Sequence, residues 1–270
     1  SDEDDAVGDA AFVVVAVPTI YLRKVLPRFT GRLPADAIIV SVTKGIEQKT
    51  HRRPSQIVRE YFPDHRLAVL SGPSHAEEVA RELPTTVVCA SAEDDVAWRV
   101  QSALHTTGFR IYVSRDVVGV ELGGALKNVI AIAAGVCEGL EFGDNSKSAL
   151  MTRGLAEMTR LGVALGADAA TFRGLSGMGD LITTCISPFG RNRRVGLQIA
   201  RGKTIEEINE GMEMVAEGVH TTRAVVELAE QLGIDVPISQ EVFNVLFECK
   251  GPEVAVIDLM TREAREEKEN

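Results

Sequence analysis

The sequence predicts a doubly wound α/β domain followed by an all-α C-terminal domain. In the first part of the chain, short apolar runs rich in β-branched residues alternate with helix-length segments. This alternation is typical of a mainly parallel sheet with helices packed on it. Beyond about residue 113 the strand-like runs stop, and helix-length segments continue to the end. We therefore expect one domain over residues 1–114 and a second over residues 115–270.

Five apolar runs are the expected strands. Residues 11–17 form a continuous apolar run that Pro18 ends, which suits a strand covered on both faces. The other runs are residues 37–42, 67–70, 85–89 and 110–113. Stretches of helical length, such as residues 56–61 and 93–105, separate several of them.

The second half of the chain carries helix signals. Residues 121–135 form a helix-length stretch rich in glycine and alanine, and Thr204 and Glu207 have the spacing of a capping box. Apolar residues recur at helical spacing in residues 221–232 and 240–247, and a last helix is expected from about Pro252.

The composition excludes several classes of protein. With 270 residues, 45% of them hydrophobic and 25% charged, the chain can bury a substantial core, which argues against disorder and small disulfide scaffolds. The longest apolar runs, residues 10–17 and 129–137, fall short of the roughly 18 residues that span a bilayer, so we expect no membrane span. A net charge of −10 disfavours binding to nucleic acid. The acidic start does not resemble a signal peptide, and we expect a cytoplasmic protein.

The cysteines and histidines are scattered along the chain. The four cysteines form no Cys-x-x-Cys pair, and buried free thiols in a reducing compartment are the simplest interpretation. The five histidines show neither His-x-x-x-His spacing nor a cluster with cysteine that suits zinc. We therefore expect no metal site.

Two of the expected strands end in polar residues. Ligands of open α/β sheets bind beyond the carboxyl ends of the strands. Lys44 follows the run at residues 37–42 and brings an ammonium group to that edge. After the next run, Ser74 and Glu77 have capping-box spacing, so Ser74 is expected to begin a helix whose free N–H groups favour an anion. The alternative is a surface lysine and an ordinary helix cap.

Lys127 is the single cation of the stretch rich in glycine and alanine. Small and apolar neighbours disfavour the charged form of a lysine, which lowers its pKa towards the range useful for proton transfer. Lys127 is therefore a candidate general acid/base. The alternative is a lysine that extends from a buried helix to solvent.

A glycine-rich loop leads to Asp180, with Thr184 about one helical turn further on. The carboxylate of Asp180 is expected either to cap a helix or to orient a nearby ammonium group. A few residues later, Arg191 and Asn192 offer donors that match phosphate oxygens. On so acidic a chain, the basic cluster of residues 191–194 indicates a small phosphate site, and a solvated helix face is the alternative.

Taken together and in order, these segments resemble NAD(P)-dependent glycerol-3-phosphate dehydrogenases of the bacterial type. The matching stretches are residues 16–18, 41–47, 71–74, 121–128, 143–147, 177–185, 190–193 and 215–219. The resemblance implies a Rossmann-type nucleotide-binding domain and hydride transfer between a nicotinamide and the C2 carbon of the substrate. The reaction would interconvert dihydroxyacetone phosphate and sn-glycerol 3-phosphate, the backbone precursor of glycerophospholipids.

The resemblance also implies roles for individual residues. The family's catalytic lysine falls on Lys127, which would move the proton of the C2 hydroxyl, and Asp180 lines the same site. Contacts to the substrate fall on Lys44, Gly72, Ser74, Thr184, Arg191 and Asn192. Contacts to the cofactor, NADH or NADPH, fall on Lys44, Ala76, Arg191, Val215 and Glu217. Gly190 departs from the pattern, because many bacterial members have a serine there that contacts the substrate.

The front of the chain departs further from the family. Members of the family begin with a strand and a Gly-x-Gly-x-x-Gly turn that holds the pyrophosphate of the cofactor. In this sequence, no such turn follows a strand. We therefore expect a partial Rossmann-type domain without its first strands. The residue that would distinguish NAD from NADP follows the second of those strands.

The leading hypothesis is thus a glycerol-3-phosphate dehydrogenase that acts on a small phosphorylated substrate. One alternative is a non-catalytic, truncated module that binds small phosphates at Arg191 and Asn192. Another is a related dehydrogenase that acts on a small hydroxy acid. The residues expected to bind a substrate phosphate, Arg191 and Asn192, make this alternative less favoured. An apolar helical domain of this type commonly pairs, so a homodimer is a further hypothesis.

Overall fold

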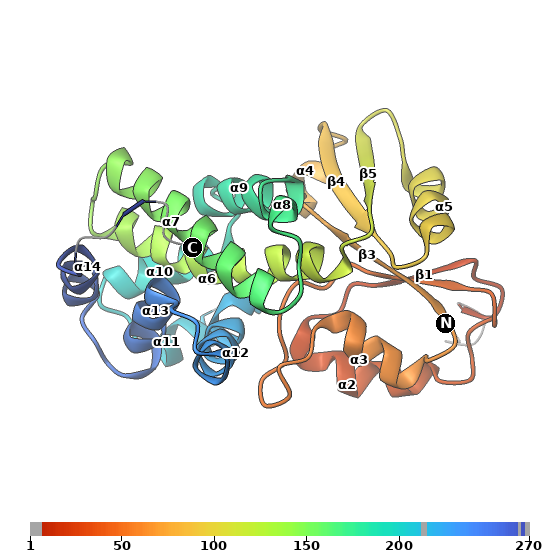
Figure 1. Ribbon diagram of the computed structural model, residues 1–270, viewed down its shortest axis with the longest axis horizontal. Coiled ribbons are helices and arrows are strands. Elements are labelled where there is room, and N and C mark those ends of the chain that lie inside the picture. The colour runs from red at the N-terminus through yellow and green to blue at the C-terminus, as the bar shows by residue number, and fades with distance from the viewer. Residues whose placement is uncertain (1–6, 212–214, 264–265, 268–270) are drawn as a thin grey trace.

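Figure 1 shows a helix-covered sheet beside a larger group of helices in this computed structural model, which describes residues 7–211, 215–263, 266 and 267. The five expected strands are confirmed, with ends that shift by one or two residues. The α/β class followed by an all-α part is confirmed as well. The strands are β1 (Phe12–Val15), β2 (Ile38–Ser41), β3 (Arg66–Ser71), β4 (Thr85–Ala90) and β5 (Phe109–Ser114).

The sheet is mainly parallel, with the strand order β1-β2-β3-β4-β5. β1 pairs with β2, β2 with β3 and β4 with β5 in parallel, so that Val13 lies opposite Ile39 and Ile39 opposite Leu67. β3 and β4 are antiparallel, because the short helix between them, α4 (Ala76–Val79), does not carry the chain back across the sheet. The carboxyl ends of β1, β2 and β3 therefore meet at one edge.

Helices cover both faces of the sheet. Side chains alternate along a strand, so Val40 of β2 packs with Val96 of α5 (Asp94–Leu104) on one face. Its neighbour Ile39 packs on the other face with Ile57 of α3 (Pro54–Tyr61). The central strands are buried on both faces, which explains their continuous apolar runs. The same half contains η1 (Thr19–Tyr21), α2 (Leu22–Val25) and η2 (Leu26–Phe29).

The helical half is built around one long buried helix, α6 (Val117–Gly139). Small residues let α10 (Arg191–Ala200) approach it closely: a Cβ on Gly196 would lie 1.9 Å from the carbonyl oxygen of Ile132. The other elements of this half are α7 (Asp144–Ala164), α8 (Ala169–Phe172), η3 (Leu175–Gly179), α9 (Asp180–Ile186), α11 (Ile205–Glu210), α12 (Glu217–Leu232), α13 (Pro237–Phe247) and α14 (Pro252–Met260).

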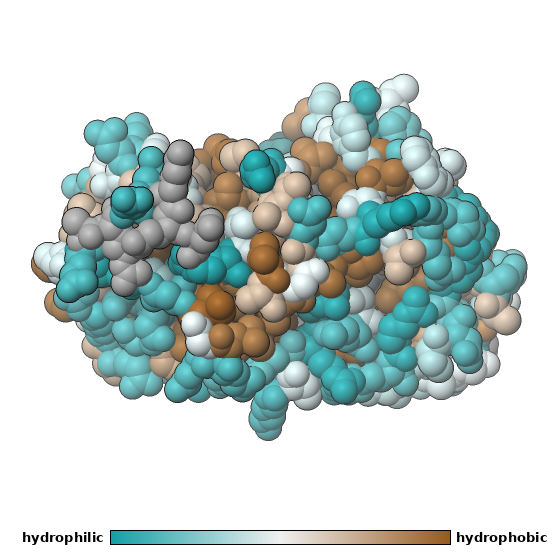
Figure 2. Space-filling model, in the orientation of Figure 1, coloured by the Kyte–Doolittle hydropathy of each residue, from teal (hydrophilic) through white to brown (hydrophobic). Residues whose placement is uncertain are grey.

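The surface is polar at both ends and more apolar in the middle of the face shown in Figure 2. Among the described residues, α6 is the one helix long and apolar enough to cross a membrane. However, 83% of its most apolar window is buried inside the protein, as in the core helix of a folded domain.

Two smaller expectations have mixed outcomes. The capping box is confirmed, because Thr204 N donates to Glu207 Oε2 at 2.9 Å and Glu207 N donates to Thr204 Oγ1 at 3.3 Å. The cysteines are free thiols, and three of them are buried as expected. Cys249 is exposed because it lies in the turn between α13 and α14.

Candidate active site

Two lysines share one carboxylate where the sheet meets the helices. Lys127 lies on α6, and its Nζ is 2.8 Å from Oδ1 of Asp180, the first residue of α9. Lys44 follows β2, and its Nζ is 2.7 Å from Oδ2 of the same carboxylate. The side chains of Lys127 and Asp180 are 7% and 3% exposed, and that of Lys44 is 23% exposed. The structure thus brings together three residues that are far apart in sequence.

Burial governs the protonation of these groups. Desolvation lowers the pKa of Lys127 to about 8, and the neighbouring charge of Asp180 opposes this shift. Desolvation acts to raise the pKa of Asp180, but the charges of Lys127 and Lys44 outweigh it and the pKa is lowered. The lowered pKa expected for Lys127 is confirmed, and it suits a general acid/base that works near neutral pH.

Asp180 orients ammonium groups and does not cap a helix. The N-cap residue of α9 is Gly179, and both carboxylate oxygens of Asp180 accept hydrogen bonds from lysines. One turn later, Thr184 Oγ1 accepts a hydrogen bond from Lys127 Nζ at 2.5 Å. Because Lys127 is itself buried and bonded to two buried residues, Asp180 and Thr184, it does not extend to solvent.

Glycines on α6 let other segments reach this cluster. A Cβ on Gly124 would lie 2.6 Å from Ser71 Oγ and 3.3 Å from Lys44 Cγ. A Cβ on Gly123 would lie 2.5 Å from the carbonyl oxygen of Ser176. The glycine-rich sequence of α6 therefore serves the close approach of the sheet and of the segment before α9.

The segment after β3 turns back over Lys44. Gly72 has a φ of +140°, which favours glycine, and its carbonyl oxygen accepts from Lys44 Nζ at 2.9 Å and from Ser74 Oγ at 3.0 Å. The hydroxyl of Ser74 therefore bonds to the carbonyl oxygen two residues before it and does not cap a helix. The expected capping box of Ser74 and Glu77 is wrong, since α4 begins at Ala76 and has no side-chain cap.

The start of α10 is tied to the neighbouring helices by side-chain amides. Asn192 Nδ2 donates to Asn128 Oδ1 at 2.9 Å, and Asn192 Oδ1 accepts from Gly218 N at 2.9 Å. Because Asn128 follows Lys127 directly, these bonds connect α10 to the lysine's own turn of α6. Arg191 is exposed at the same helix start, and its Nη1 donates to the carbonyl oxygen of Val215 at 3.1 Å.

The remaining arginines of this basic cluster lie outside that arrangement. Arg193 is paired with Glu138, with Nε 2.8 Å from Oε2, and Arg194 is exposed. Of residues 191–194, Arg191 and Asn192 therefore remain the candidates for the phosphate site expected from the sequence.

Glu217 connects the end of β1 to the helical half. Thr19 N donates to Glu217 Oε1 at 2.8 Å, and burial raises the pKa of Glu217. Within the described part of the chain, Glu217 Oε2 is buried without a hydrogen-bond partner. Among the other residues expected at the cofactor, Val215 lies beside Arg191, whereas Ala76 is exposed at the start of α4.

Nearly the whole chain matches one enzyme family. Residues 1–97 match the family described as "NAD-dependent glycerol-3-phosphate dehydrogenase N-terminus", and residues 116–257 match the corresponding C-terminus. The chain belongs to the NAD-dependent glycerol-3-phosphate dehydrogenase family. A curated family member from Chlorobium phaeobacteroides, named glycerol-3-phosphate dehydrogenase (NAD(P)+), is 51% identical over 98% of this chain and 81% of the relative.

Other members of the family support the same assignment. The enzyme of that name from Thermoanaerobacter sp. is 49% identical over 99% of this chain and 81% of its own length. The crystal structure of the Coxiella burnetii glycerol-3-phosphate dehydrogenase superposes with a TM-score of 0.92 at 36% identity, covering 97% of this chain and 80% of that one.

Sequence reasoning missed two residues of the site in this glycerol-3-phosphate dehydrogenase family member. Asn128 carries an amide into a buried, largely apolar helix, and that position next to Lys127 could have drawn attention to it. Thr19 follows Pro18 beyond the end of β1, and strand ends were the right place to search. Neither position has a spacing signal that predicts its partner, because each partner comes from a distant segment.

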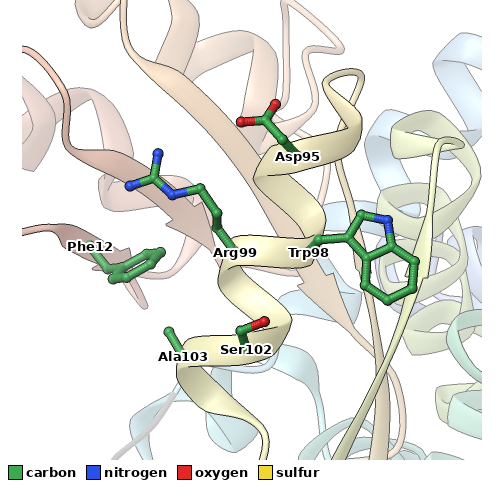
Figure 3. Close-up of a pocket in the computed structure, with 6 residues that line it drawn as sticks. All are labelled: Phe12, Asp95, Trp98, Arg99, Ser102 and Ala103. Carbon is green, nitrogen blue, oxygen red and sulfur yellow. The ribbon is translucent and has the colours of Figure 1, made fainter.

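A surface hollow of the sheet half lies away from this site. Figure 3 shows Phe12 of β1 opposite α5, with Asp95, Trp98, Arg99, Ser102 and Ala103 lining the rest. None of these six residues belongs to the site expected for the glycerol-3-phosphate dehydrogenase family. In the part of the chain that is described, no group of three or more His, Cys, Asp or Glu side chains could hold a metal ion.

Proposed function

We propose that the chain catalyses the reversible reduction of dihydroxyacetone phosphate to sn-glycerol 3-phosphate with NADH or NADPH. One observation carries the proposal: the buried Lys127, with a pKa of about 8, is held by Asp180 and Thr184 where sheet and helices meet. The family to which the chain belongs supplies the substrate and the cofactor.

Lys127 is the proposed general acid/base. In the reduction, its protonated Nζ donates a proton to the oxygen at C2, and in the reverse direction its neutral Nζ accepts that proton. Asp180 and Thr184 fix the direction of Nζ through bonds of 2.8 and 2.5 Å. The second ammonium group, that of Lys44, would stabilise negative charge as it develops on the C2 oxygen.

Arg191 and Asn192 are the proposed partners of the substrate phosphate. They form the first turn of α10, where backbone N–H groups have no partner within the helix and favour an anion. The planar guanidinium of Arg191 is exposed and can offer two donors to phosphate oxygens. Gly72 and Ser74 would contact the substrate from the segment after β3.

The cofactor is proposed to bind along the carboxyl edge of the sheet, where open α/β sheets hold nucleotides. Lys44, Ala76, Arg191, Val215 and Glu217 would contact it, and the buried, unpartnered Oε2 of Glu217 fits a ligand that brings a donor. The chemistry that a nicotinamide supplies when bound is the transfer of a hydride to or from C2. The chain's own residues orient the substrate and move the proton.

The absorbance of reduced nicotinamide tests the proposal. In the full-length enzyme, Lys127→Ala should lower kcat for dihydroxyacetone phosphate by roughly 10²- to 10⁴-fold, the usual contribution of a general acid. Lys203→Ala is the matched control, since Lys203 is an exposed lysine bonded to Gln198 and should leave turnover unchanged. Substantial turnover by Lys127→Ala would contradict the role of this lysine.

The same assay separates the two alternative functions. A non-catalytic phosphate-binding module would bind dihydroxyacetone phosphate without oxidising the nicotinamide. A hydroxy-acid dehydrogenase would turn over a non-phosphorylated hydroxy acid at a comparable rate. The buried acid/base cluster of Lys127, Asp180 and Thr184 weighs against a non-catalytic module. The exposed Arg191 beside Asn192, which suits a phosphate, weighs against a hydroxy-acid dehydrogenase.

Three coarser proposals concern organisation. We propose that residues 1–114 and 115–270 act as nucleotide-binding and substrate-binding domains, a division supported by the change from β5 to α6 between Ser114 and Val117. We also propose that the chain forms a homodimer and works in the cytoplasm. Light scattering of the purified protein and fractionation of the source cells test these two proposals.

A further inference from the structure

His75 places an imidazole at the edge of the candidate active site. It lies between Ser74 and Ala76, where the segment after β3 enters α4. The residue as a whole is half-buried, but its Nε2 atom is buried and has no hydrogen-bond partner among the described residues. A buried polar atom without a partner costs free energy, unless a ligand supplies that partner.

The ring of His75 lies against the turn that leads into α10. Its centroid is 6.1 Å from that of Phe189, with the two rings tilted by 59°. Phe189 stands two residues before Arg191, and Gly190 between them is the N-cap of α10. The imidazole therefore reaches from the sheet half towards the proposed phosphate partners in the helical half.

The surroundings of His75 favour an uncharged imidazole that can donate a hydrogen bond. Burial lowers the pKa of His75, and the ammonium group of Lys127 lowers it further, while Glu77, Glu78 and Asp180 act in the opposite direction. At neutral pH the ring is thus uncharged, and one nitrogen carries a proton that it can donate.

We propose that His75 is a further substrate-binding residue, whose Nε2–H donates a hydrogen bond to the phosphoryl group held at the start of α10. This inference rests on the proposed function, because it takes the phosphate position from Arg191 and Asn192. The substrate would then bridge the two halves of the site, with its phosphate between an imidazole from one half and a guanidinium from the other.

Three substitutions of His75 distinguish the effect of its Nε2 hydrogen bond from the effect of its ring packing. His75→Phe keeps a ring against Phe189 and removes both nitrogens. His75→Gln places an amide nitrogen near the position of Nε2, whereas His75→Asn, the matched control, places one near Nδ1. Each full-length variant is assayed for its KM for dihydroxyacetone phosphate, its kcat, and the inhibition constant of inorganic phosphate as a competitive inhibitor. Thermal unfolding confirms that each variant is folded.

We expect His75→Phe to raise both the KM and the inhibition constant of phosphate by about tenfold or more, as for a hydrogen bond to a charged group. The loss should fall on KM more than on kcat, and His75→Gln should recover most of it. The inference is overturned if the inhibition constant is unchanged in His75→Phe, or if His75→Asn recovers affinity as well as His75→Gln does.

Arg191→Ala distinguishes this inference from the proposal on which it rests. If Arg191→Ala weakens inhibition by phosphate and His75→Phe does not, then the inference about His75 is wrong and the phosphate site stands. If neither variant changes the inhibition, the phosphate site at the start of α10 is itself wrong. If both weaken it, the two residues bind the same group.

Discussion

Lys127 and Asp180 form a buried ion pair between α6 and α9, with Nζ and Oδ1 2.8 Å apart. Removing both charges from water carries a large cost, which the attraction between them only partly offsets. The balance leaves Lys127 with a pKa of about 8, close to neutral pH. Such a pair suits a change of protonation during a reaction better than it suits the stabilisation of the fold.

The pKa of Lys127 predicts opposite pH dependences for the two directions of the reaction. Oxidation of glycerol 3-phosphate needs the neutral lysine, so its kcat/KM should rise with pH and level off above about 8. Reduction of dihydroxyacetone phosphate needs the protonated lysine, so its kcat/KM should fall above about 8. Profiles of kcat/KM against pH check this, and two profiles with the same slope would contradict it.

Replacement of Asp180 by asparagine should shift those profiles. Asp180→Asn keeps the shape of the side chain but removes the charge that raises the pKa of Lys127. The pKa seen in the reduction should therefore move to lower pH, and kcat/KM should fall by about 10²-fold as Lys127 loses its orientation. A shift towards higher pH would show that the carboxylate does not act on Lys127 in this way.

Gly196→Ala should destabilise the helical half. A Cβ at this position would lie 1.9 Å from the carbonyl oxygen of Ile132, so α6 and α10 would have to move apart. We expect a loss of about 2 kcal/mol or more in the free energy of unfolding, measured with denaturant. Gly179→Ala is the control, because its Cβ would meet no atom closer than 3.7 Å and its φ of −59° suits alanine.

Glu157→Ala should also destabilise the protein, for a different reason. Glu157 is 3% exposed on α7 and accepts hydrogen bonds from Ile238 N, Ser239 N and Ser239 Oγ at the start of α13. Truncation leaves these donors unpaired, at an expected cost of about 2–4 kcal/mol in the free energy of unfolding.

Glu230→Ala, at an exposed position of α12, is the control for Glu157→Ala and should change the free energy of unfolding by less than about 0.5 kcal/mol. Equal effects of the two variants would show that the bonds of Glu157 to the start of α13 contribute little to stability.

The strands and the long helix could be predicted from local sequence, because apolar runs and runs of small residues are visible within a short stretch of the chain. Residues 37–42 could be predicted to contain a strand, observed as β2 (Ile38–Ser41), because both faces of that segment are covered and its composition is largely apolar. Lys127 could be singled out for a similar reason, as the single cation in an apolar helix.

Contacts between distant segments could not be predicted in this way. Nothing near Ser74 shows that its hydroxyl is used by Gly72 O, which is why the expected cap was wrong. The antiparallel pairing of β3 with β4 depends on how short α4 is, and helix length is poorly defined by sequence patterns. The choice between capping and orientation for Asp180 likewise required the positions of both lysines.

The bond between Lys44 and Asp180 couples the proton affinity of Lys127 to the contact between the sheet half and the helical half. Lys44 comes from the sheet half and Asp180 from the helical half, and the charge of Lys44 lowers the pKa of Lys127. If the two halves separate, Lys44 returns to water and Lys127 holds its proton more tightly. The acidity of Lys127 therefore depends on a residue that comes from the other half of the chain.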